Sequence, residues 1–285
     1  MILTESPDEL RALLDEARRA GKSVGLHPTM GSLHGGHGAN IRRAAAECDV
    51  VAVSIFVNPL QFGPGEDFDA YPRDLERDCS RAEEAGAGIV FAPSTAAMFP
   101  EEPRVTVRVN RLADVLEGAH RPGHFDGVAT IVTKLLAVAG PCHAYFGEKD
   151  YQQLVVVRHL VADLSLPVVV VGCPTVREPD GLALSSRNAY LSVPERAAAT
   201  VLYWSLLAGK RAVEEQRFTD VAGARAAMTA VARREGLFDL DYVEVVDPNT
   251  LCVPPSIGAE VRLLVDGRIG KARLIDNLAA NRAED

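Results

Sequence analysis

Five short apolar runs alternate with helical patterns along the first 175 residues. The runs are SVGL at 23–26, VVAVSIFV at 50–57, GIVFA at 88–92, HAYF at 143–146 and PVVVVG at 167–172. They are apolar on both faces, which favours strands inside a parallel sheet that helices cover. Helical patterns at about 37–46, 74–85, 124–139 and 150–164 separate them. This order predicts a doubly wound α/β domain.

The pattern changes at both ends of this region. Ser6, Pro7 and Glu9 predict a capping box at the start of an amphipathic helix that stops at Gly21. From about residue 176, two Ala-rich helices at roughly 194–216 and 219–235 precede the strand-like runs LDYVEVV and EVRLLVD. We therefore expect a domain over 1–175 followed by a smaller α+β domain over 176–285.

Composition and charge narrow the class of protein. The 285 residues are 47% hydrophobic and 24% charged, as in ordinary globular proteins, and the net charge of -9 argues against binding to nucleic acid. The five cysteines are odd in number and widely spaced, which favours small buried side chains in a reducing compartment. The first residues lack a signal-peptide pattern and no run of 18 apolar residues occurs, so we expect a cytoplasmic protein without membrane association.

The ligand edge of such a sheet lies beyond the carboxyl ends of its strands, and the segments there are unusual. His34-Gly35-Gly36-His37 stands at a strand-to-helix junction. A helix that begins near His37 would turn its positive end and two imidazoles toward a phosphate. A His-x-x-His pair also fits surface or zinc-binding histidines, although no third zinc ligand is marked.

Two further segments offer donors to an anion. In Gly147-Glu148-Lys149-Asp150, the lysine could reach phosphate oxygens and Asp150 could cap a helix or bind a ribose hydroxyl. Leu184-Ser185-Ser186-Arg187-Asn188 combines hydroxyls with a guanidinium. Each segment also fits an ordinary polar turn. Nothing around Ser185 resembles a nucleophile elbow, so covalent serine catalysis is disfavoured.

Amides and carboxylates follow the second apolar run. Asn58 and Gln61 would point two neutral amides into the cleft, as suits a polyhydroxy acid. One of the carboxylates at positions 67, 69, 74 and 78 could bind Mg²⁺, although acidic loop residues are usually only solvated. Neither a Walker A loop nor a dinucleotide fingerprint is present in the sequence.

Taken together, a series of motifs resembles the pantothenate synthetases, which belong to the His-x-Gly-His nucleotidyltransferase superfamily. The motifs are PTMGSLHGGH, FVNPLQFGPGEDFDAYPRD, HFDGVATIV, FGEKDYQQL, PTVREPDGLALSSRNAYLS, DYVEVVDPNTL and RLIDN, in order from about residue 22 to 277. The resemblance implies a Rossmann-like domain, a smaller C-terminal lid domain and a homodimer. It also implies a ligase that uses ATP and Mg²⁺ to convert pantoate into a pantoyl adenylate. β-Alanine would then attack to give pantothenate and AMP, with pyrophosphate released in the first step.

The resemblance also implies a set of site residues. Those that would bind ATP are Met30, Gly31, Ser32, Leu33, His34, Gly35, Gly36, His37, Gly147, Glu148, Lys149, Asp150, Val176, Leu184, Ser185, Ser186 and Arg187. Among them His34, His37, Lys149, Ser185, Ser186 and Arg187 would assist catalysis, with His37 as the proton donor. Gln61 and Gln153 would hold pantoate, Asn58 with Gln61 would border the β-alanine site, Arg121 and His124 would lie in the cleft, and Asp78 would bind magnesium.

One departure from the family pattern bears on catalysis. Gly35 replaces the usual Glu after the first histidine, and Gly38 replaces an apolar residue after the second. Glycine near a helix start costs about 1 kcal/mol relative to alanine, so we expect a looser turn and an altered rate. Three alternatives stay open: a nucleotidylyltransferase that stops at an adenylylated product, a nucleotide-binding protein without catalysis, and a zinc hydrolase.

Overall fold

The computed structural model describes residues 1–215 and 220–282, and the chain forms two compact units. The first unit contains residues 1–114, 118–148 and 153–174. The second contains the chain from Thr175 onward together with residues 115–117 and 149–152. Two short segments that precede residue 175 in the sequence therefore group with the second unit. The predicted role of the C-terminal part as a lid stays a prediction.

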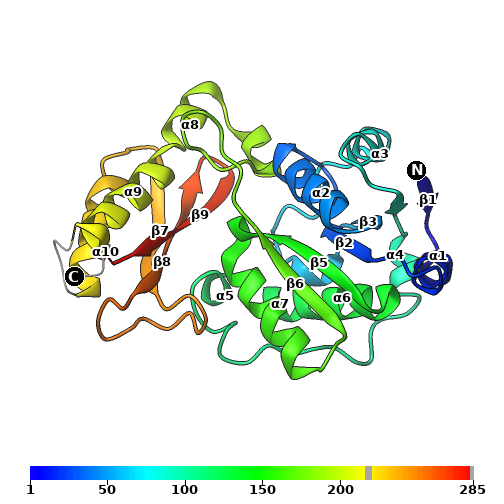
Figure 1. Ribbon diagram of the computed structural model, residues 1–285. Coiled ribbons are helices and arrows are strands. Elements are labelled where there is room, and N and C mark those ends of the chain that lie inside the picture. Colours follow the sequence, from blue (N-terminus) through cyan, green and yellow to red (C-terminus); the bar gives the residue numbers. More distant parts are fainter. Residues whose placement is uncertain (216–219, 283–285) are drawn as a thin grey trace. The chain divides into compact units, whose positions relative to one another are not determined.

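A six-stranded parallel sheet forms the centre of the first unit (Figure 1). Its strands are β1 (Ile2–Thr4), β2 (Val24–Thr29), β3 (Val50–Ile55), β4 (Ile89–Phe91), β5 (Cys142–Gly147) and β6 (Val168–Cys173), in the order β1-β4-β3-β2-β5-β6. Because the inner strands are covered on both faces, their apolar runs lack alternation. The predicted doubly wound α/β architecture is confirmed.

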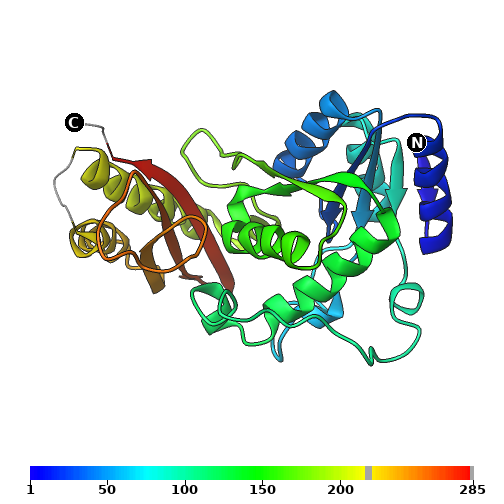
Figure 2. The ribbon, with the colours of Figure 1, turned by 60° about the horizontal axis from the view of Figure 1, so that its bottom comes forward.

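Helices cover the two faces of this sheet (Figure 2). α2 (Gly35–Glu47) and α3 (Leu75–Glu84) pack on one face, where Ile41, Ala44 and Ala82 join Val53 and Tyr145 in a buried cluster. The remaining helical elements of this region are α1 (Pro7–Arg19), η1 (Pro59–Gln61), α4 (Thr95–Met98), α5 (Glu117–His120), α6 (His124–Ala139), η2 (Glu148–Asp150) and α7 (Tyr151–Asp163). Ser6 is the N-cap residue of α1, and its side chain accepts from the Glu9 N–H.

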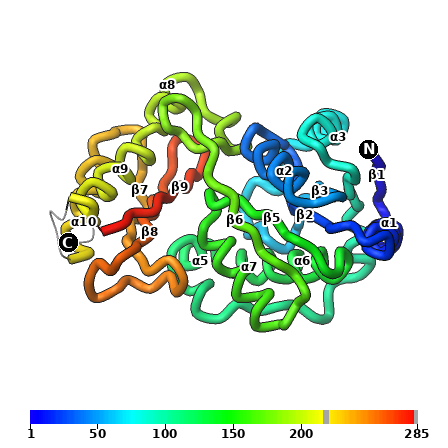
Figure 3. The backbone as a smooth tube through the Cα atoms, in the orientation of Figure 1, coloured from blue at the N-terminus to red at the C-terminus, as the bar shows by residue number. Residues whose placement is uncertain are grey.

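The strands β2 and β5 are neighbours although more than 100 residues separate them, as the tube in Figure 3 shows. Their register contains only Gly25 opposite His143 and Leu26 opposite Ala144, whereas β2 pairs with β3 along its whole length. β2 and β5 therefore separate toward their carboxyl ends. The order of strands reverses at this pair, and such a switch point is where open α/β sheets bind ligands.

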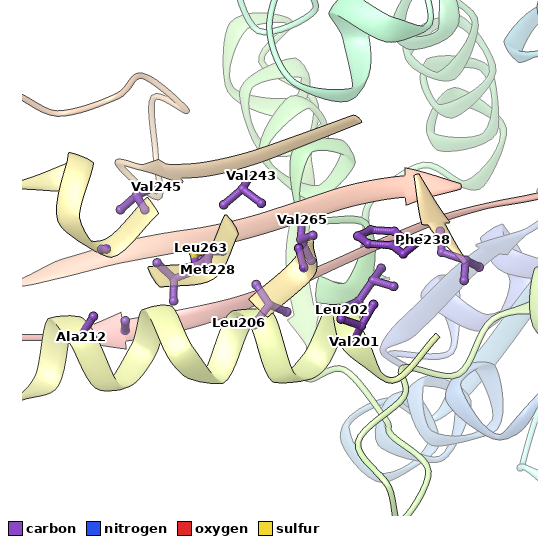
Figure 4. Close-up of a cluster of buried hydrophobic side chains, with 14 of the residues drawn as sticks. Val201, Leu202, Leu206, Ala212, Met228, Phe238, Val243, Val245, Leu263 and Val265 are labelled. Carbon is purple, nitrogen blue, oxygen red and sulfur yellow. The ribbon is translucent and has the colours of Figure 1, made fainter. Parts of the chain in front are cut away.

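The second unit places helices on a three-stranded antiparallel sheet. Its strands, in the order β7-β8-β9, are β7 (Phe238–Val246), β8 (Glu260–Ile269) and β9 (Ala272–Asn281). Its helices are η3 (Ser186–Tyr190), α8 (Val193–Ala198), α9 (Val201–Glu214) and α10 (Val221–Ala232). Figure 4 shows Leu202 and Leu206 of α9 against Val243 of β7 and Val265 of β8. This core confirms the predicted smaller α+β part.

The structure corrects several local predictions. The expected helix at 194–216 is two helices, because a turn at 199–200 separates α8 from α9; its predicted end at 216, like the predicted start at 219, lies outside the described residues. β1 and β9 were not predicted as strands. Only half of the capping box at Ser6 forms, since the Glu9 carboxylate accepts instead from Thr4 Oγ1.

The cysteine prediction is correct in part. Cys48, Cys142 and Cys173 are buried, but Cys79 is half-buried and Cys252 is exposed, and the structure joins none of the five in a disulfide. Burial raises the pKa of the Cys142 thiol to about 12, which keeps that sulfur protonated. Among the described residues, no helix combines the length and apolar character that a membrane span requires.

Candidate active site

The histidine segment lies on a loop whose backbone a buried carboxylate holds in place. Between the end of β2 and the start of α2, Gly31 has φ 86° and Ser32 has φ 51°. Asp78, on α3 and 1% exposed, accepts the Ser32 N–H at 2.6 Å and the Leu33 N–H at 2.8 Å. The Arg81 guanidinium donates to the Leu33 carbonyl. This loop is thus anchored to α3 through its main chain, which leaves its tip well defined.

The two histidines cap the helix that follows. α2 begins at Gly35 with His34 as its N-cap residue, two positions earlier than predicted. His34 Nδ1 accepts the Gly36 N–H at 3.2 Å, and His37 Nδ1 accepts the His34 N–H at 3.2 Å. The ring centroids are 4.1 Å apart. Since Nδ1 is the acceptor in each ring, a neutral imidazole here carries its proton on Nε2. Each Nε2–H is a donor of the kind that a phosphate oxygen accepts.

The glycines that depart from the family pattern sit in the first turn of this helix. A side-chain carbon at Gly38 would lie 3.2 Å from Arg42 Nη1, the end of a flexible side chain that can move. Nothing in the surrounding packing therefore demands glycine at position 38. The reciprocal histidine caps satisfy backbone donors that such a turn leaves open. Whether the turn is looser than usual stays a prediction.

The two amides after β3 differ in what they can contact. Asn58 is 1% exposed, and its Nδ2 donates to Gln61 Oε1 and to the Gly127 carbonyl, both at 3.1 Å. Its Oδ1 accepts the Leu60 N–H. Its donors and its acceptor hold the chain around Gln61, and its predicted place at the border of the cleft stays a prediction. Gln61 Nε2 donates to Met30 Sδ at 2.8 Å, which brings two predicted site residues together.

Arg121 and His124 support the same stretch of backbone. The Arg121 guanidinium binds Glu66 through Nε at 2.7 Å and Nη2 at 2.5 Å. His124 Nδ1 donates to the Gln61 carbonyl at 2.8 Å, so its Nε2 accepts from Arg121 Nη1 at 3.1 Å. Burial raises the pKa of Glu66, but the hydrogen bond and charge of Arg121 outweigh this and lower it overall. In this arrangement both side chains position Gln61.

Neighbouring glutamines on α7 have different environments. Gln152 is 4% exposed; its Oε1 accepts the Glu117 N–H at 3.0 Å and its Nε2 donates to the Val115 carbonyl at 2.8 Å. Gln153 is only partly buried and is the better candidate for a ligand contact. Gly147 ends β5 in the first unit, and Glu148 follows as the first residue of η2.

The predicted ATP residues of the second unit form two groups. Lys149 Nζ lies 3.6 Å from Asp150 Oδ1, and both side chains are accessible, at 20% and 50% exposure. The predicted N-cap role of Asp150 is not seen, because η2 runs through this residue into α7. Val176 and Leu184 are joined by a backbone hydrogen bond of 3.0 Å.

The serines of the second group lie in a short helical turn. Ser185 caps η3 by accepting the Arg187 N–H at 3.3 Å. This cap favours the interpretation of the segment as a turn. Ser186 and Arg187 are half-buried in η3 itself. The donor-rich character of the segment remains compatible with an anion.

Two residues of β9 support both groups, and no role was expected for them from the residues alone. Asp276 binds Arg177 through two hydrogen bonds of 2.6 and 2.9 Å, and Arg177 also donates to the Gly181 carbonyl. Asn277 Nδ2 donates to the Lys149 carbonyl at 2.7 Å. The motif RLIDN thus bonds to the backbone of Lys149 and to the side chain of Arg177, the residue that follows Val176. The sequence feature that could have identified these two residues is a carboxylate and an amide within an otherwise apolar strand.

Metal binding has limited support in the side-chain arrangement. Within residues 1–215 and 220–282, no three His, Cys, Asp or Glu side chains gather as a metal site. The zinc hypothesis therefore gains nothing from the histidine pair. The magnesium assignment of Asp78 stays a prediction. Both of its oxygens already accept backbone N–H groups, so any ion there would share a carboxylate that shapes the loop.

Substitution of Asp78 tests this shaping role. We expect Asp78→Ala to lower the free energy of unfolding by about 2–4 kcal/mol, because two backbone donors lose a charged acceptor. Asp78→Asn should cost less, since one oxygen can still accept. Urea unfolding in magnesium-free buffer measures the difference.

A matched control lies in the same helix. Asp74 is the exposed N-cap of α3 and accepts the Arg77 N–H, so Asp74→Ala should cost only about 1 kcal/mol. Equal losses for the two alanine variants would contradict the shaping role. A loss that appears only when magnesium is present would instead assign Asp78 to the metal.

Comparison with known proteins places this geometry in a family. The family model described as Pantoate-beta-alanine ligase matches residues 2–279. Pantothenate synthetase from Heliobacterium modesticaldum is 50% identical over 278 residues, covering 98% of this chain and 99% of the relative. The relative from Caldicellulosiruptor bescii is 45% identical, covering 98% of both chains.

Solved structures give the same result. The crystal structure of pantothenate synthetase from Thermus thermophilus matches with a TM-score of 0.92 and 50% identity, covering 98% of this chain and 99% of that one. Pantoate-beta-alanine ligase from Francisella tularensis, complexed with beta-gamma ATP and beta-alanine, matches with a TM-score of 0.80 and 32% identity over 98% and 97%. The chain belongs to the pantoate-beta-alanine ligase family.

Proposed function

We propose that this protein condenses pantoate with β-alanine in an ATP-dependent reaction that passes through a pantoyl adenylate. The family match over residues 2–279 carries the proposal. The complex of the Francisella tularensis relative with beta-gamma ATP and beta-alanine supports two of the substrates. The Nε2–H donors of His34 and His37 at a helix N-terminus supply what adenylyl transfer requires, namely hydrogen bonds to phosphate oxygens.

The chemistry proceeds in two steps. A pantoate carboxylate oxygen attacks the α-phosphorus of ATP, the bond from that phosphorus to the bridging oxygen breaks, and pyrophosphate leaves. The amine of β-alanine then attacks the acyl carbon, the bond to the phosphate oxygen breaks, AMP leaves and the amine loses a proton. Activation is needed because a carboxylate is a poor acyl donor until AMP provides a good leaving group. Enclosure protects the adenylate from water.

Roles for individual residues are part of the proposal. His37 and His34 donate to the phosphate oxygens where negative charge increases, and Lys149 with the segment Ser185–Arg187 binds phosphate. Gln61 and Gln153 bind pantoate through neutral amides. Asp78 is the carboxylate that would hold Mg²⁺, and an ion bound there would offset charge on the phosphates of ATP. A homodimer in solution also belongs to this proposal, and sedimentation equilibrium tests it.

The decisive experiment follows AMP and pyrophosphate separately. Purified protein with ATP, Mg²⁺ and pantoate should release one equivalent of pyrophosphate in a burst and continue to turn over only when β-alanine is added. AMP and pantothenate should then accumulate in equal amounts. Omitting pantoate should abolish release of both products.

Other outcomes identify the alternatives. Steady pyrophosphate release without β-alanine would indicate a nucleotidylyltransferase. ATP binding measured by calorimetry without any AMP under these conditions would indicate a nucleotide-binding protein that lacks catalysis. Either result would overturn the ligase proposal.

A further inference from the structure

A third imidazole, that of His27, lies inside the first unit near the two that cap α2. His27 is in the middle of β2 and is 3% exposed, whereas the residues around it in the strand are mainly apolar. Its ring centroid lies 5.8 Å from that of His37. The motif series that carries the family resemblance gives this residue no role. A buried histidine is expected to have a hydrogen-bond partner or a functional role, since burying an unpaired polar group costs free energy.

One nitrogen of this ring bridges the two strands that separate at the switch point. His27 Nδ1 lies 2.8 Å from the Tyr145 carbonyl oxygen on β5. A carbonyl can only accept, so Nδ1 carries the proton and donates. Backbone pairing of β2 with β5 ends one position earlier, at Leu26 and Ala144. The side chain thus extends the connection between the strands past the last backbone pair.

The opposite nitrogen is left as an acceptor. With the proton on Nδ1, a neutral His27 carries a lone pair on Nε2, which has no hydrogen-bond partner among the described residues. Burial lowers the pKa of His27 to about 4, with the Tyr145 carbonyl opposing this shift. The ring therefore stays neutral near pH 7. Tyr145, on β5, is itself protonated, because burial raises the pKa of its hydroxyl.

The His27 ring is one of two imidazoles that lie beside His37. His37 is held at Nδ1 by the His34 N–H, and its ring is flanked by His34 at 4.1 Å and His27 at 5.8 Å between centroids. The His27 ring cannot rotate without losing its bond to Tyr145. The ring is thus fixed at a centroid distance of 5.8 Å from that of His37. Because it is uncharged, it does not oppose positive charge on its neighbour.

We propose that His27 is a positioning residue for His37. Its hydrogen bond to Tyr145 joins β2 to β5 where strand pairing ends, and its fixed ring holds the His37 imidazole in its donating orientation. The proposal rests on the proposed role of His37 in adenylyl transfer. Small displacements of a reacting group cost a large factor in rate, so a modest loosening here should be measurable.

Two substitutions separate the effect of the hydrogen bond between His27 and Tyr145 from the effect of filling the space at position 27. His27→Val removes the donor to Tyr145 but keeps a buried apolar strand residue. His27→Asn keeps a donor at the position of Nδ1 without the ring. We expect His27→Val to lower kcat for pantoate-dependent pyrophosphate release roughly tenfold. We expect His27→Asn to recover part of that loss, and the KM for β-alanine to stay unchanged in both variants.

A spectroscopic measurement tests positioning without reference to turnover. Proton–nitrogen correlation spectra of protein labelled with ¹⁵N-histidine report which ring nitrogen carries the proton. In the wild-type protein His27 should be protonated on Nδ1 and His37 on Nε2. In His27→Val the His37 signals should shift or broaden toward a mixture of tautomers, and in His27→Asn they should stay nearer to the wild type. The exposed His159, replaced by Asn, is the control for assignment and activity.

Failure of the positioning role and failure of the proposed function give different results in these experiments. A wild-type protein that never forms AMP would remove the proposed function, while the spectra would still decide whether His27 orients His37. The positioning role is overturned if His27→Val leaves the His37 signals unchanged, whether or not kcat falls. It is also overturned if His27→Asn, which keeps the donor to Tyr145, shifts the His37 signals more than His27→Val does. Thermal unfolding identifies a variant that fails to fold, and the Asn variant then decides alone.

Discussion

His37→Ala is expected to slow pantoate-dependent pyrophosphate release by about 10²- to 10⁴-fold, the range found for loss of a positioned proton donor. The substitution removes the Nε2–H that we propose to act on the phosphate, and it removes the Nδ1 acceptor that caps α2. Binding of ATP, measured by calorimetry, should weaken far less, because the lost interaction strengthens as charge develops. Stopped-flow detection of pyrophosphate measures the rate.

Two conservative variants separate the chemical role of His37 from its capping role. His37→Asn can still accept the His34 N–H but has no donor at the position of Nε2, so it should recover stability without recovering rate. His37→Gln offers an amide N–H near that position and should retain more activity than His37→Asn. If His37→Asn is as active as the wild type, the imidazole serves the helix and not the reaction. His159→Ala, in an exposed position on α7, should leave the rate unchanged.

Arg273→Met is expected to destabilise the second unit by about 3–5 kcal/mol at pH values above about 8, where Asp266 is ionised in the folded state, since it removes the counter-charge of a buried carboxylate. Asp266, on β8, is fully buried and accepts a hydrogen bond from Arg273 Nε at 3.1 Å. The same guanidinium lies 3.6 Å from Glu117 and 3.5 Å from Asp241. Three carboxylates thus share one cation. Urea unfolding followed by the fluorescence of Trp204, the single tryptophan and part of α9, reports on this unit.

The strand pairing offers a matched control for this prediction. Arg268 on β8 stands opposite Arg273 in the register but is exposed, so Arg268→Met should change stability by less than about 0.5 kcal/mol. Adding Asp266→Asn to Arg273→Met should recover much of the loss, because no buried charge then stays unpaired. An Arg273→Met protein as stable as the Arg268→Met protein would contradict this account.

The pH dependence of the second unit follows from the same cluster. Burial is the main cause that raises the pKa of Asp266 to about 8, with the charge of Glu117 adding to it and Arg273 opposing it. The folded state therefore holds this proton at pH values where the unfolded chain has lost it. The stabilisation is complete below the ordinary pKa of aspartate and is lost as pH rises through about 8. In urea unfolding, Asp266→Asn should remove this loss of stability between about pH 4 and 8.

Local pattern was sufficient for most of the first unit. The apolar runs predicted β2 to β6, and the helical patterns predicted α2, α3, α6 and α7 within a few residues. Burial on both faces imposes a continuous apolar run that is visible without a structure. β1 was missed because three residues carry too little pattern. β9 was missed because Asp276 and Asn277 interrupt its apolar positions, and these are the residues that support Lys149 and Arg177.

The sequence by itself therefore determined the α/β class, the smaller α+β part and the position of the histidine turn, because each depends on neighbours in the chain. The tertiary structure decided what individual polar residues do. Asp78 acts on a loop 46 positions away, and His27 bonds to a carbonyl 118 positions away. The Asn58 side chain donates to the Gly127 carbonyl 69 positions away. A hydrogen bond needs its partner in place within about 3 Å, and only the folded chain brings such distant partners together.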